Sequence, residues 1–405
     1  MGSNEEEKIR ERCLYIVPNS PISPNYRGGG AAIYYEQLHS LAQLGVEIYL
    51  WHFCYDSRFA ELENFILSEP DIWADVNAIC TKVYRTQVPD IPTLAERVYN
   101  RSSNILTANE IRNPLVRGKC YSKFKEVLAE VEPDIIWAQH LVSAQISLLQ
   151  KKVPVIYSHH DWLYKIKSTD PNQKWDPKTK KIEENIARKG TAVVSGSAIE
   201  CKQLIDIGCS NVHYIPVAYK AATNVISKIG GKPRVVHLGG LGTTATRIGL
   251  ERFFDVVWER LDKGSTDMWV VGDISDASDK MKKDLAMVTC AGFVKDLGDV
   301  LRPNDIHVIP WEYETGQRTR LVQAFNYGQA VVATKQSVMC FPEAIDGYNC
   351  LLVDSLDEMP RAIDALVEND EQRTRLSDNA RATFKAHFTR EVLLPKYKAV
   401  IDSIA

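Results

Sequence analysis

The chain has 405 residues, which is enough for two or three domains with a sizeable apolar core. Its 45% apolar and 25% charged residues are ordinary for a globular protein and argue against long disordered regions. The 49 basic and 52 acidic side chains leave a net charge of −3, so the chain lacks the positive charge typical of nucleic-acid-binding proteins, and no nucleic-acid partner is expected.

The sequence also gives no signal for a membrane span or for secretion. No apolar run approaches the roughly 18 residues that a transmembrane helix needs, and the start of the chain is polar and acidic. Nine cysteines are scattered singly without a CxxC pair, which predicts neither a zinc site nor a disulfide framework. We therefore expect a cytoplasmic protein.

Short apolar, β-branched runs recur along the chain, separated by segments of helix length. In the first half these runs are Cys13–Val17, Val46–Phe53, Asp134–Ala138, Val153–Ser158, Thr191–Ser195 and Val212–Pro216. In the second half they are Arg234–Leu238, Met268–Gly272, Val288–Phe293, Asp305–Pro310, Ala330–Thr334 and Cys350–Val353. Because the runs are continuously apolar rather than alternating, they predict strands covered on both faces, as in parallel sheets with crossover helices.

Crossover helices are visible between these strands. Ile33–Leu44 has apolar residues at helical spacing and ends at Gly45, a typical helix terminator. Two six-stranded sheets are more common than one sheet of twelve strands, and the polar stretch 218–232 would separate them. We therefore predict an α/β protein with two doubly wound parallel-sheet domains, at 1–217 and 233–385, facing each other across a cleft. Ligands of such sheets bind at the carboxyl ends of the strands, so chemistry is expected in that cleft.

The strand ends of the first domain carry two signals. Gly28–Gly30 opens the first helix, where exposed N–H groups and the helix N-terminus suit a phosphate, although a flexible turn is the plain alternative. The GxGxxG spacing is absent, which disfavours a dinucleotide. Later, one strand ends at Gln139 and His140, and the next ends at His159–Asp161.

Histidines at the carboxyl ends of adjacent parallel strands can converge on one cleft. They could donate hydrogen bonds, transfer a proton or bind a metal there, or each could simply bond to nearby backbone. No third cluster of ligands with metal spacing accompanies them, so we expect no metal.

Two loops of the second domain suit a diphosphate. The loop Gly239–Arg247 is rich in glycine and threonine and places an arginine at a helix start. The segment Pro310–Thr334 runs from a strand end through a loop with Arg318 and Arg320 into a helix, where Gln323 could reach a ribose hydroxyl. Arginines paired with neighbouring glutamates at a solvated helix start are the alternative.

Taken in order, these features resemble the retaining glycosyltransferases of the GT-B fold, closest to glycosyltransferase family 4. The segments that carry the resemblance are Gly28–Gly30, Gly45–Ile48, Asp134–His140, His160–Asp161, Ala192–Ser197, Ile215–Pro216, Gly239–Leu241, Val271–Gly272, Gly292–Val294, Asp305–Pro310 and Gly316–Thr334. The resemblance implies two Rossmann-like domains and a terminal helix within 386–405 that crosses back to the first domain.

The resemblance also implies an activity and a site. A sugar would pass from a nucleoside-diphosphate sugar to a glycan or other hydroxyl acceptor with retention of configuration, without a metal or a resident cofactor. His140, Arg247 and Arg318 would act in catalysis, and His159, His160 and Asp161 would face the acceptor. The donor would contact Gly29, Gly30, Gly240, Arg247, Glu314, Thr315, Gly316, Arg318, Arg320 and Gln323.

The chain departs from the family pattern at several of these positions. The two glutamates usual in the fourth motif correspond to Thr315 and Gln323, with Glu314 one residue away. The usual arginine of the second-domain loop is Gly240, and the usual strand-end histidine is Gln139, with His140 next to it. The sequence therefore leaves open a glycosyltransferase-like binding or scaffold protein that has lost turnover.

A nucleotide-sugar epimerase, which can share this fold, is a further alternative. Two basic and aromatic stretches, 97–125 and 162–181, could touch a phosphorylated acceptor or an anionic membrane surface. Solvated helix faces and loops account for most of these charges equally well.

Overall fold

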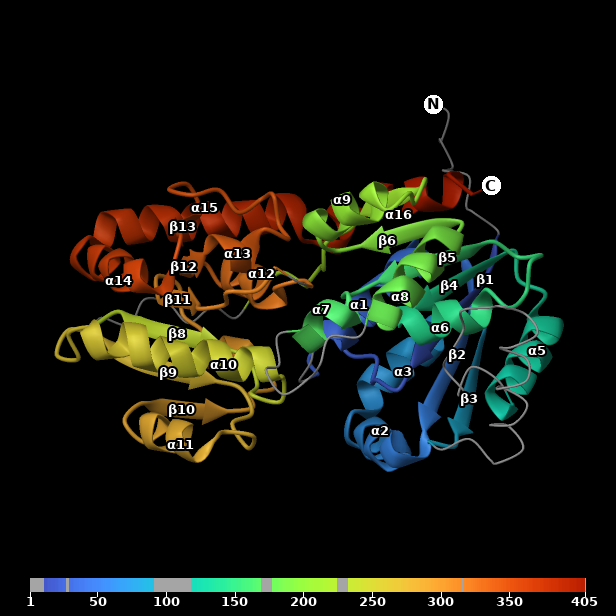
Figure 1. The fold of residues 1–405 in the computed structure, drawn as a ribbon, viewed down its shortest axis with the longest axis horizontal. Helices are drawn as coiled ribbons and strands as arrows, with labels where there is room; N and C mark the ends of the chain where they lie inside the picture. Colours follow the sequence, from blue (N-terminus) through green and yellow to red (C-terminus); the bar gives the residue numbers. More distant parts are fainter. Residues whose placement is uncertain are drawn as a thin grey trace.

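The computed structural model describes residues 11–26, 29–90, 118–168, 177–223, 232–314 and 316–404, and within them the chain forms two parallel sheets flanked by helices (Figure 1). The first sheet has the order β3-β2-β1-β4-β5-β6-β7. Its strands are β1 (Arg12–Pro18), β2 (Glu47–Tyr55), β3 (Lys82–Val88), β4 (Ile135–Gln139), β5 (Val155–His159), β6 (Ala192–Ser195) and β7 (Val212–Tyr214). The helices of this domain are α1 (Gly29–Gln43), α2 (Asp56–Ser68), α3 (Pro70–Ile79), α5 (Lys119–Val131), α6 (His140–Ser147), α7 (Leu163–Ser168), α8 (Pro177–Lys189) and α9 (Ala198–Asp206).

The prediction of six strands for the first sheet is wrong, because the sheet has seven. The missed strand is β3, which pairs only with β2 and forms the edge of the sheet. Its sequence, KVYRTQV, has three polar residues between the apolar ones, and only Tyr84 and Val88 are buried. A strand with one solvated face carries no continuous apolar run, which was the signal used to find the others.

The second sheet has the order β10-β9-β8-β11-β12-β13, with the predicted number of six strands. These are β8 (Arg234–Leu238), β9 (Asp267–Val271), β10 (Thr289–Gly292), β11 (Ile306–Ile309), β12 (Ala330–Thr334) and β13 (Cys350–Val353). Its helices are α10 (Thr244–Arg252), α11 (Asp279–Leu285), α12 (Thr319–Asn326), α13 (Lys335–Val338), α14 (Met359–Glu368) and α15 (Asp370–His387). Every strand pair in both sheets is parallel, as the continuous apolar runs indicated.

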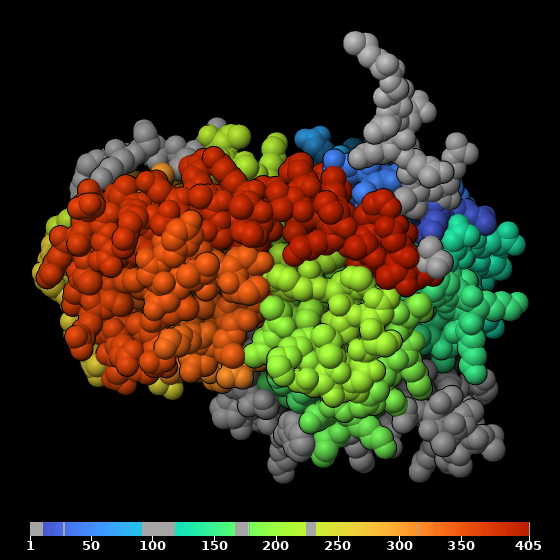
Figure 2. Space-filling view, turned by 90° about the horizontal axis from the view of Figure 1, so that it is seen from above, coloured from blue at the N-terminus to red at the C-terminus, as the bar shows by residue number. Residues whose placement is uncertain are grey.

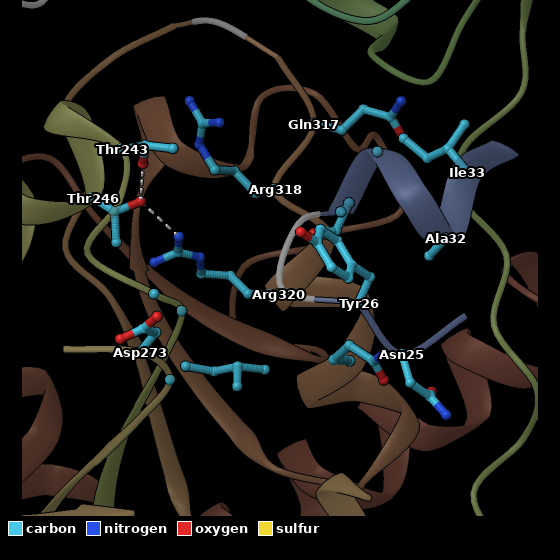
Figure 3. Close-up of a pocket in the computed structure, with 18 of the residues that line it drawn as sticks. Asn25, Tyr26, Ala32, Ile33, Thr243, Thr246, Asp273, Gln317, Arg318 and Arg320 are labelled. Atoms are coloured by element: carbon cyan, nitrogen blue, oxygen red, sulfur yellow. Dashed lines mark hydrogen bonds between the residues drawn. The ribbon is translucent and has the colours of Figure 1, made fainter. Parts of the chain in front are cut away.

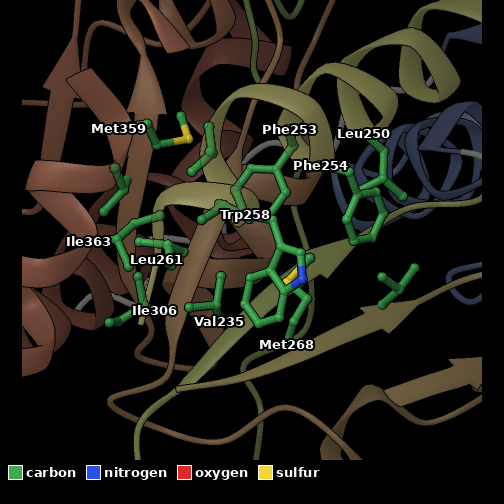
Figure 4. Close-up of a cluster of buried hydrophobic side chains, with 14 of the residues drawn as sticks. Val235, Leu250, Phe253, Phe254, Trp258, Leu261, Met268, Ile306, Met359 and Ile363 are labelled. Atoms are coloured by element: carbon green, nitrogen blue, oxygen red, sulfur yellow. The ribbon is translucent and has the colours of Figure 1, made fainter. Parts of the chain in front are cut away.

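One face of the second sheet is covered by a large hydrophobic cluster (Figure 4). A π-helical turn, Phe253–Val257, follows α10 and leads into a short 3-10 turn, Trp258–Arg260. Phe253 and Trp258 are buried there against strand residues that include Val235 and Met268. This packing buries β8 and β9 in the core of the second domain, and the loops at their carboxyl ends line the cleft between the domains.

The last helix, α16 (Arg390–Asp402), returns to the first domain. Leu393, Tyr397 and Val400 are buried in the first domain's core, and Arg390 Nε donates to Glu36 of α1 at 2.8 Å. In the space-filling view α15 and α16 form one band across both domains (Figure 2). The segment that leaves the first domain lies beside the segment that returns to it, since the Tyr219 N–H donates to the Phe388 carbonyl at 3.0 Å. Over the described ranges, every helix is too short or too polar to span a bilayer.

Candidate functional site

A cavity of about 740 Å³ lies between the two domains, where the carboxyl ends of both sheets face each other. In Figure 3, Tyr26, Ala32 and Ile33 of the first domain approach it from one side. Thr243, Thr246 and Asp273, which follow β8 and β9, approach it from the other side together with Arg318 and Arg320. The cavity is thus assembled from strand-end loops, as expected for doubly wound sheets.

Two arginines place positive charge in the cavity, which Lys295 also lines. Arg318 is buried and its guanidinium lies 3.8 Å from the centre of the Trp311 ring, a cation–π contact. Arg320 donates to Thr246 Oγ1 at 3.0 Å, and burial lowers its pKa to about 9, so it remains a cation at neutral pH. Cations that are partly removed from water interact more strongly with an anion than fully solvated cations do.

The N-termini of two helices meet at the same place. Gly29 begins α1, and a Cβ added there would lie only 2.6 Å from Oγ1 of Thr319, which begins α12. The close approach therefore requires glycine at position 29. Helix N-termini carry partial positive charge and unsatisfied N–H groups, so the pair adds to the positive potential of the arginines.

The histidines form a neutral stack on the first domain's side. The rings of His140 and His160 lie 4.0 Å apart between centres, and Nε2 of His140 is hydrogen-bonded to the hydroxyl of Tyr34. Burial, together with His159, lowers the pKa of His140 to about 4, and burial lowers the pKa of His160 well below its usual value. His140 also has a left-handed backbone with φ of 61°, which is uncommon for a histidine and directs its ring into the cavity.

A buried glutamine, Gln139, is hydrogen-bonded to this histidine stack. Gln139 Oε1 accepts a hydrogen bond from His160 Nε2 at 2.8 Å, which places the proton of the neutral imidazole on Nε2. The Gln139 amide nitrogen donates to the Tyr15 hydroxyl and to Gln37 Oε1, both at 2.6 Å. Gln139, Tyr15 and Gln37 are buried and His160 lines the cavity, so the network joins the domain core to the cavity wall.

Asp161 is the acidic group that the first domain contributes to the cavity, whereas Asp273 comes from the second domain. Burial, followed by the negative charge of Glu200, raises the pKa of Asp161 to about 7, and Arg318 opposes the shift. Asp161 also contacts Gly316 of the second domain. It therefore lies where the two domains and the ligand space meet, and its charge changes near neutral pH.

The structure brings most of the predicted residues together. The cavity is lined by Gly29, Gly30, His140, His160, Asp161, Gly240, Arg318, Arg320 and Gln323. His159 lies behind it, buried 3.4 Å from Glu200, and Gly316 is buried in the contact between the domains. Glu314 is exposed, and Arg247 in the first turn of α10 is outside the lining, with its guanidinium 3.5 Å from Thr244 Oγ1. Thr315 lies outside the described residues.

Sequence reasoning missed several residues of the site, among them Trp311, Gln317, Asp273 and Tyr26. Trp311 directly follows the strand end at Pro310, so its position in the chain was the available signal. Among the described residues, no group of three or more His, Cys, Asp or Glu is placed to hold a metal ion.

Two family models match the chain, one for each domain. Residues 27–219 match Glycosyltransferase Family 4, and residues 232–369 match Glycosyl transferases group 1. A search of curated protein sequences found no match.

Solved structures resemble the chain over nearly its whole length. Anabaena HepE in complex with UDP-glucose is 15% identical with a TM-score of 0.65, covering 97% of this chain and 100% of that one. Sucrose-phosphate synthase from Thermosynechococcus elongatus is 15% identical with a TM-score of 0.73, over 98% and 99%. A variant of S. aureus TarM in complex with fondaparinux, alpha-GlcNAc-glycerol and UDP is 12% identical with a TM-score of 0.69, over 97% and 100%. These likenesses establish the predicted two-domain GT-B fold.

Proposed function

Because the chain belongs to the glycosyltransferases, as a Glycosyltransferase Family 4 domain followed by a Glycosyl transferases group 1 domain, we propose that it uses a nucleoside-diphosphate sugar as donor. The sugar is transferred to a hydroxyl of a glycan or another acceptor with retention of anomeric configuration.

The observation that carries this proposal is the pair of arginines in the interdomain cavity. Arg318 and Arg320 lie two residues apart, at and just inside the start of α12, and both line the cavity. When the bond between the donor's sugar and its diphosphate breaks, negative charge grows on the departing diphosphate. Preorganised cations in a water-poor site stabilise that charge without reorganisation, which lowers the barrier.

The first domain supplies the opposite surface. His140 is neutral because its pKa is about 4, so it offers hydrogen bonds to the transferring sugar without adding charge next to an oxocarbenium-like centre. His160 and Asp161 lie on the same side of the cavity, where the acceptor would approach. Closure of the domains excludes water, which would otherwise compete with the acceptor hydroxyl.

We further propose that the reaction needs neither a metal ion nor a resident cofactor. The two arginines and the N-termini of α1 and α12 together provide the positive charge for a diphosphate. In this design the leaving group is neutralised by residues of the chain. Activity that persists in excess EDTA supports this part of the proposal, and activity restored only by an added divalent cation opposes it.

Complexes of similar structures support the donor and acceptor classes. Anabaena HepE was solved with UDP-glucose, and the TarM variant with UDP and carbohydrate ligands. All nine cysteines of this chain are free thiols, which agrees with a reducing compartment such as the cytoplasm.

The test is a thermal-shift panel of UDP-, GDP- and ADP-sugars followed by a transfer assay with the donor that binds. A ligand bound only by the folded state raises the melting temperature. The expected results are binding of the donor, transfer of its sugar to an added acceptor, and an NMR spectrum of the product that shows the same anomeric configuration as in the donor. Binding without turnover would instead favour a scaffold, and conversion of the nucleotide sugar without acceptor would favour an epimerase.

A further inference from the structure

A buried carboxylate of the first domain reaches across the domain boundary. Glu200 lies in the first turn of α9 and is completely buried. Its Oε1 accepts a hydrogen bond from the backbone N–H of Gly316 in the second domain at 2.9 Å. Its Oε2 lies 3.4 Å from Nδ1 of His159. Glu200 does not line the cavity, so its contacts are with protein groups.

The residue that Glu200 holds begins the loop that carries both arginines. Gly316 has φ of 67°, and the side chain of Asp161 fills the place where a Cβ would be, so only glycine fits here. Arg318 and Arg320 follow two and four residues later. The direction in which the chain leaves Gly316 therefore sets where the two guanidinium groups lie.

The next residue is held from the first domain as well. Gln317 Oε1 accepts from the Val217 N–H at 3.2 Å, and the amide fits against Gly196, where a Cβ would collide with it. Two consecutive residues of the second domain's arginine loop, Gly316 and Gln317, thus contact the first domain. The loop makes these contacts only when the two domains are together.

Opposite charges on the two domains also favour this position of the arginine loop. Burial disfavours the charged form of Arg318 and lowers its pKa, whereas the negative charges of Asp161 and Glu200 favour the charged form. The first domain therefore stabilises a cation that the second domain contributes to the cavity.

We propose that Glu200 is a positioning residue of the donor site, which fixes the loop from Gly316 to Arg320 through the Gly316 N–H and so links domain closure to diphosphate binding. The link to the diphosphate rests on the proposed function, whereas the effect on the loop does not. Without Glu200 the arginines remain present but are no longer held at one place.

The test compares three variants of the full chain. E200A removes the acceptor of the Gly316 N–H, and E200Q keeps an acceptor while removing the charge. E343A is the matched control, because Glu343 Oε2 accepts from the Tyr214 hydroxyl at 2.9 Å across the same domain boundary and does not line the cavity. Hydrogen–deuterium exchange of the 312–325 segment is measured without ligand, and binding of UDP-glucose, or of the nucleotide sugar that the panel selects, is measured by calorimetry.

We expect E200A to speed exchange in this segment and to weaken nucleotide-sugar binding about tenfold, the effect of losing one hydrogen bond to a charged group. E200Q should restore slow exchange, and E343A should leave both measurements at the wild-type value. Should E200A fail to fold, E200D keeps the charge but withdraws it by one methylene, and the same acceleration of exchange is expected.

Equal exchange in E200A and the wild type overturns the inference, and so does an equal effect of E343A, because the loop would then respond to domain opening in general. If the wild type binds no nucleotide sugar, the proposed function fails, and the exchange comparison still decides the role of Glu200.

Discussion

The two sides of the cavity respond to burial in opposite ways. On the first domain's side, burial lowers the pKa of His140 to about 4, so the imidazole is neutral at physiological pH. On the second domain's side, burial lowers the pKa of Arg320 only to about 9, so the guanidinium stays charged. The difference lies in the starting values, near 6.5 for histidine and above 12 for arginine. The same cavity thus carries neutral imidazoles on one side and cations on the other.

The comparison is tested most strongly by removing the cations. R318A and R320A should each lower kcat/KM by about 100- to 1,000-fold, because a preorganised charge at the leaving group is lost. R318A should also lower stability, since Asp161 and Glu200 would lose the buried cation beside them. Steady-state kinetics with the selected donor and thermal unfolding measure both effects.

R252A is the control for these variants, because Arg252 pairs with Glu312 at 2.9 Å on the surface and does not line the cavity. A loss of activity in R252A equal to that in R320A would mean that general positive charge, rather than the two cavity arginines, carries the effect.

The neutral side should contribute mainly to the chemical step. H140A is expected to lower kcat by about 100-fold with little change in donor affinity, because a group that contacts only the transferring sugar acts chiefly in the transition state. Since the His140 pKa is about 4, the imidazole does not titrate between pH 5.5 and 8, and its contribution should be constant there. Donor affinity that collapses in H140A would place the residue in ground-state binding instead.

Asp161 is the exception on the first domain's side, because its pKa of about 7 makes it charged at high pH. Its carboxylate faces the cavity beside Arg318, with Glu200, His159 and Glu183 also nearby. The anion repels a diphosphate and competes for Arg318, so binding of UDP-glucose should weaken about tenfold as the pH rises through 7. UDP-glucose is a suitable probe, because its diphosphate diester does not titrate in this range. Calorimetry from pH 5.5 to 8.5 measures the change, and D161N should abolish it.

The same shift has a consequence for stability. The folded-state pKa of Asp161 lies above the value of an unfolded aspartate, near 3.9. The favourable contribution of Asp161 to the free energy of unfolding is therefore fully present below about pH 4 and is lost as the pH rises through about 7. D161N should accordingly raise the melting temperature at pH 8 relative to the wild type, with a smaller difference at pH 5. A wild-type stability that instead rises between pH 5 and 8 through Asp161 would contradict the shift.

The support beneath the histidine stack gives a smaller effect. Q139L removes the acceptor of His160 and leaves buried polar groups of Tyr15 and Gln37 without this partner. The expected loss is about 1–3 kcal/mol of unfolding free energy, measured by denaturant titration, with a fall in kcat that is smaller than in H140A. Retention of full stability would mean that the network is not the support of the stack.

Much of this architecture could be predicted from the sequence, because doubly covered strands have a direct signature. Runs such as Ile135–Ala138 and Ala330–Ala333 are apolar without interruption, and both are buried central strands. The half-solvated edge strand β3 has no such run and was missed. The strand-end loops of the site follow from the same reasoning, since parallel strands deliver their carboxyl ends to one edge.

The details of the site depend on information that spacing does not contain. Thr246 lines the cavity and the adjacent Arg247 does not, because α10 already begins at Thr244 and successive helical residues point about 100° apart. The hydrogen bond from Gly316 to Glu200 joins residues 116 positions apart in different domains, so it depends on how the domains meet. The departure at Gln139 marked the position in the sequence, while its role beneath His160 required the buried network.

The weakest expected effect comes from an exposed contact between the domains beside the cavity, which Lys295 lines. Lys295 Nζ lies 2.8 Å from Glu69 Oε2, and the lysine side chain is 64% exposed. Exposed ion pairs of this kind contribute about 0–1 kcal/mol and are screened by salt, unlike the buried contact of Glu200. E69Q should therefore change nucleotide-sugar affinity by less than about threefold at 0.15 M salt, and the difference should vanish at 1 M salt. An effect of E69Q as large as that of E200A, persisting at high salt, would contradict this ranking. Binding would then depend on the exposed contact between Lys295 and Glu69 rather than on the buried contact between Glu200 and Gly316.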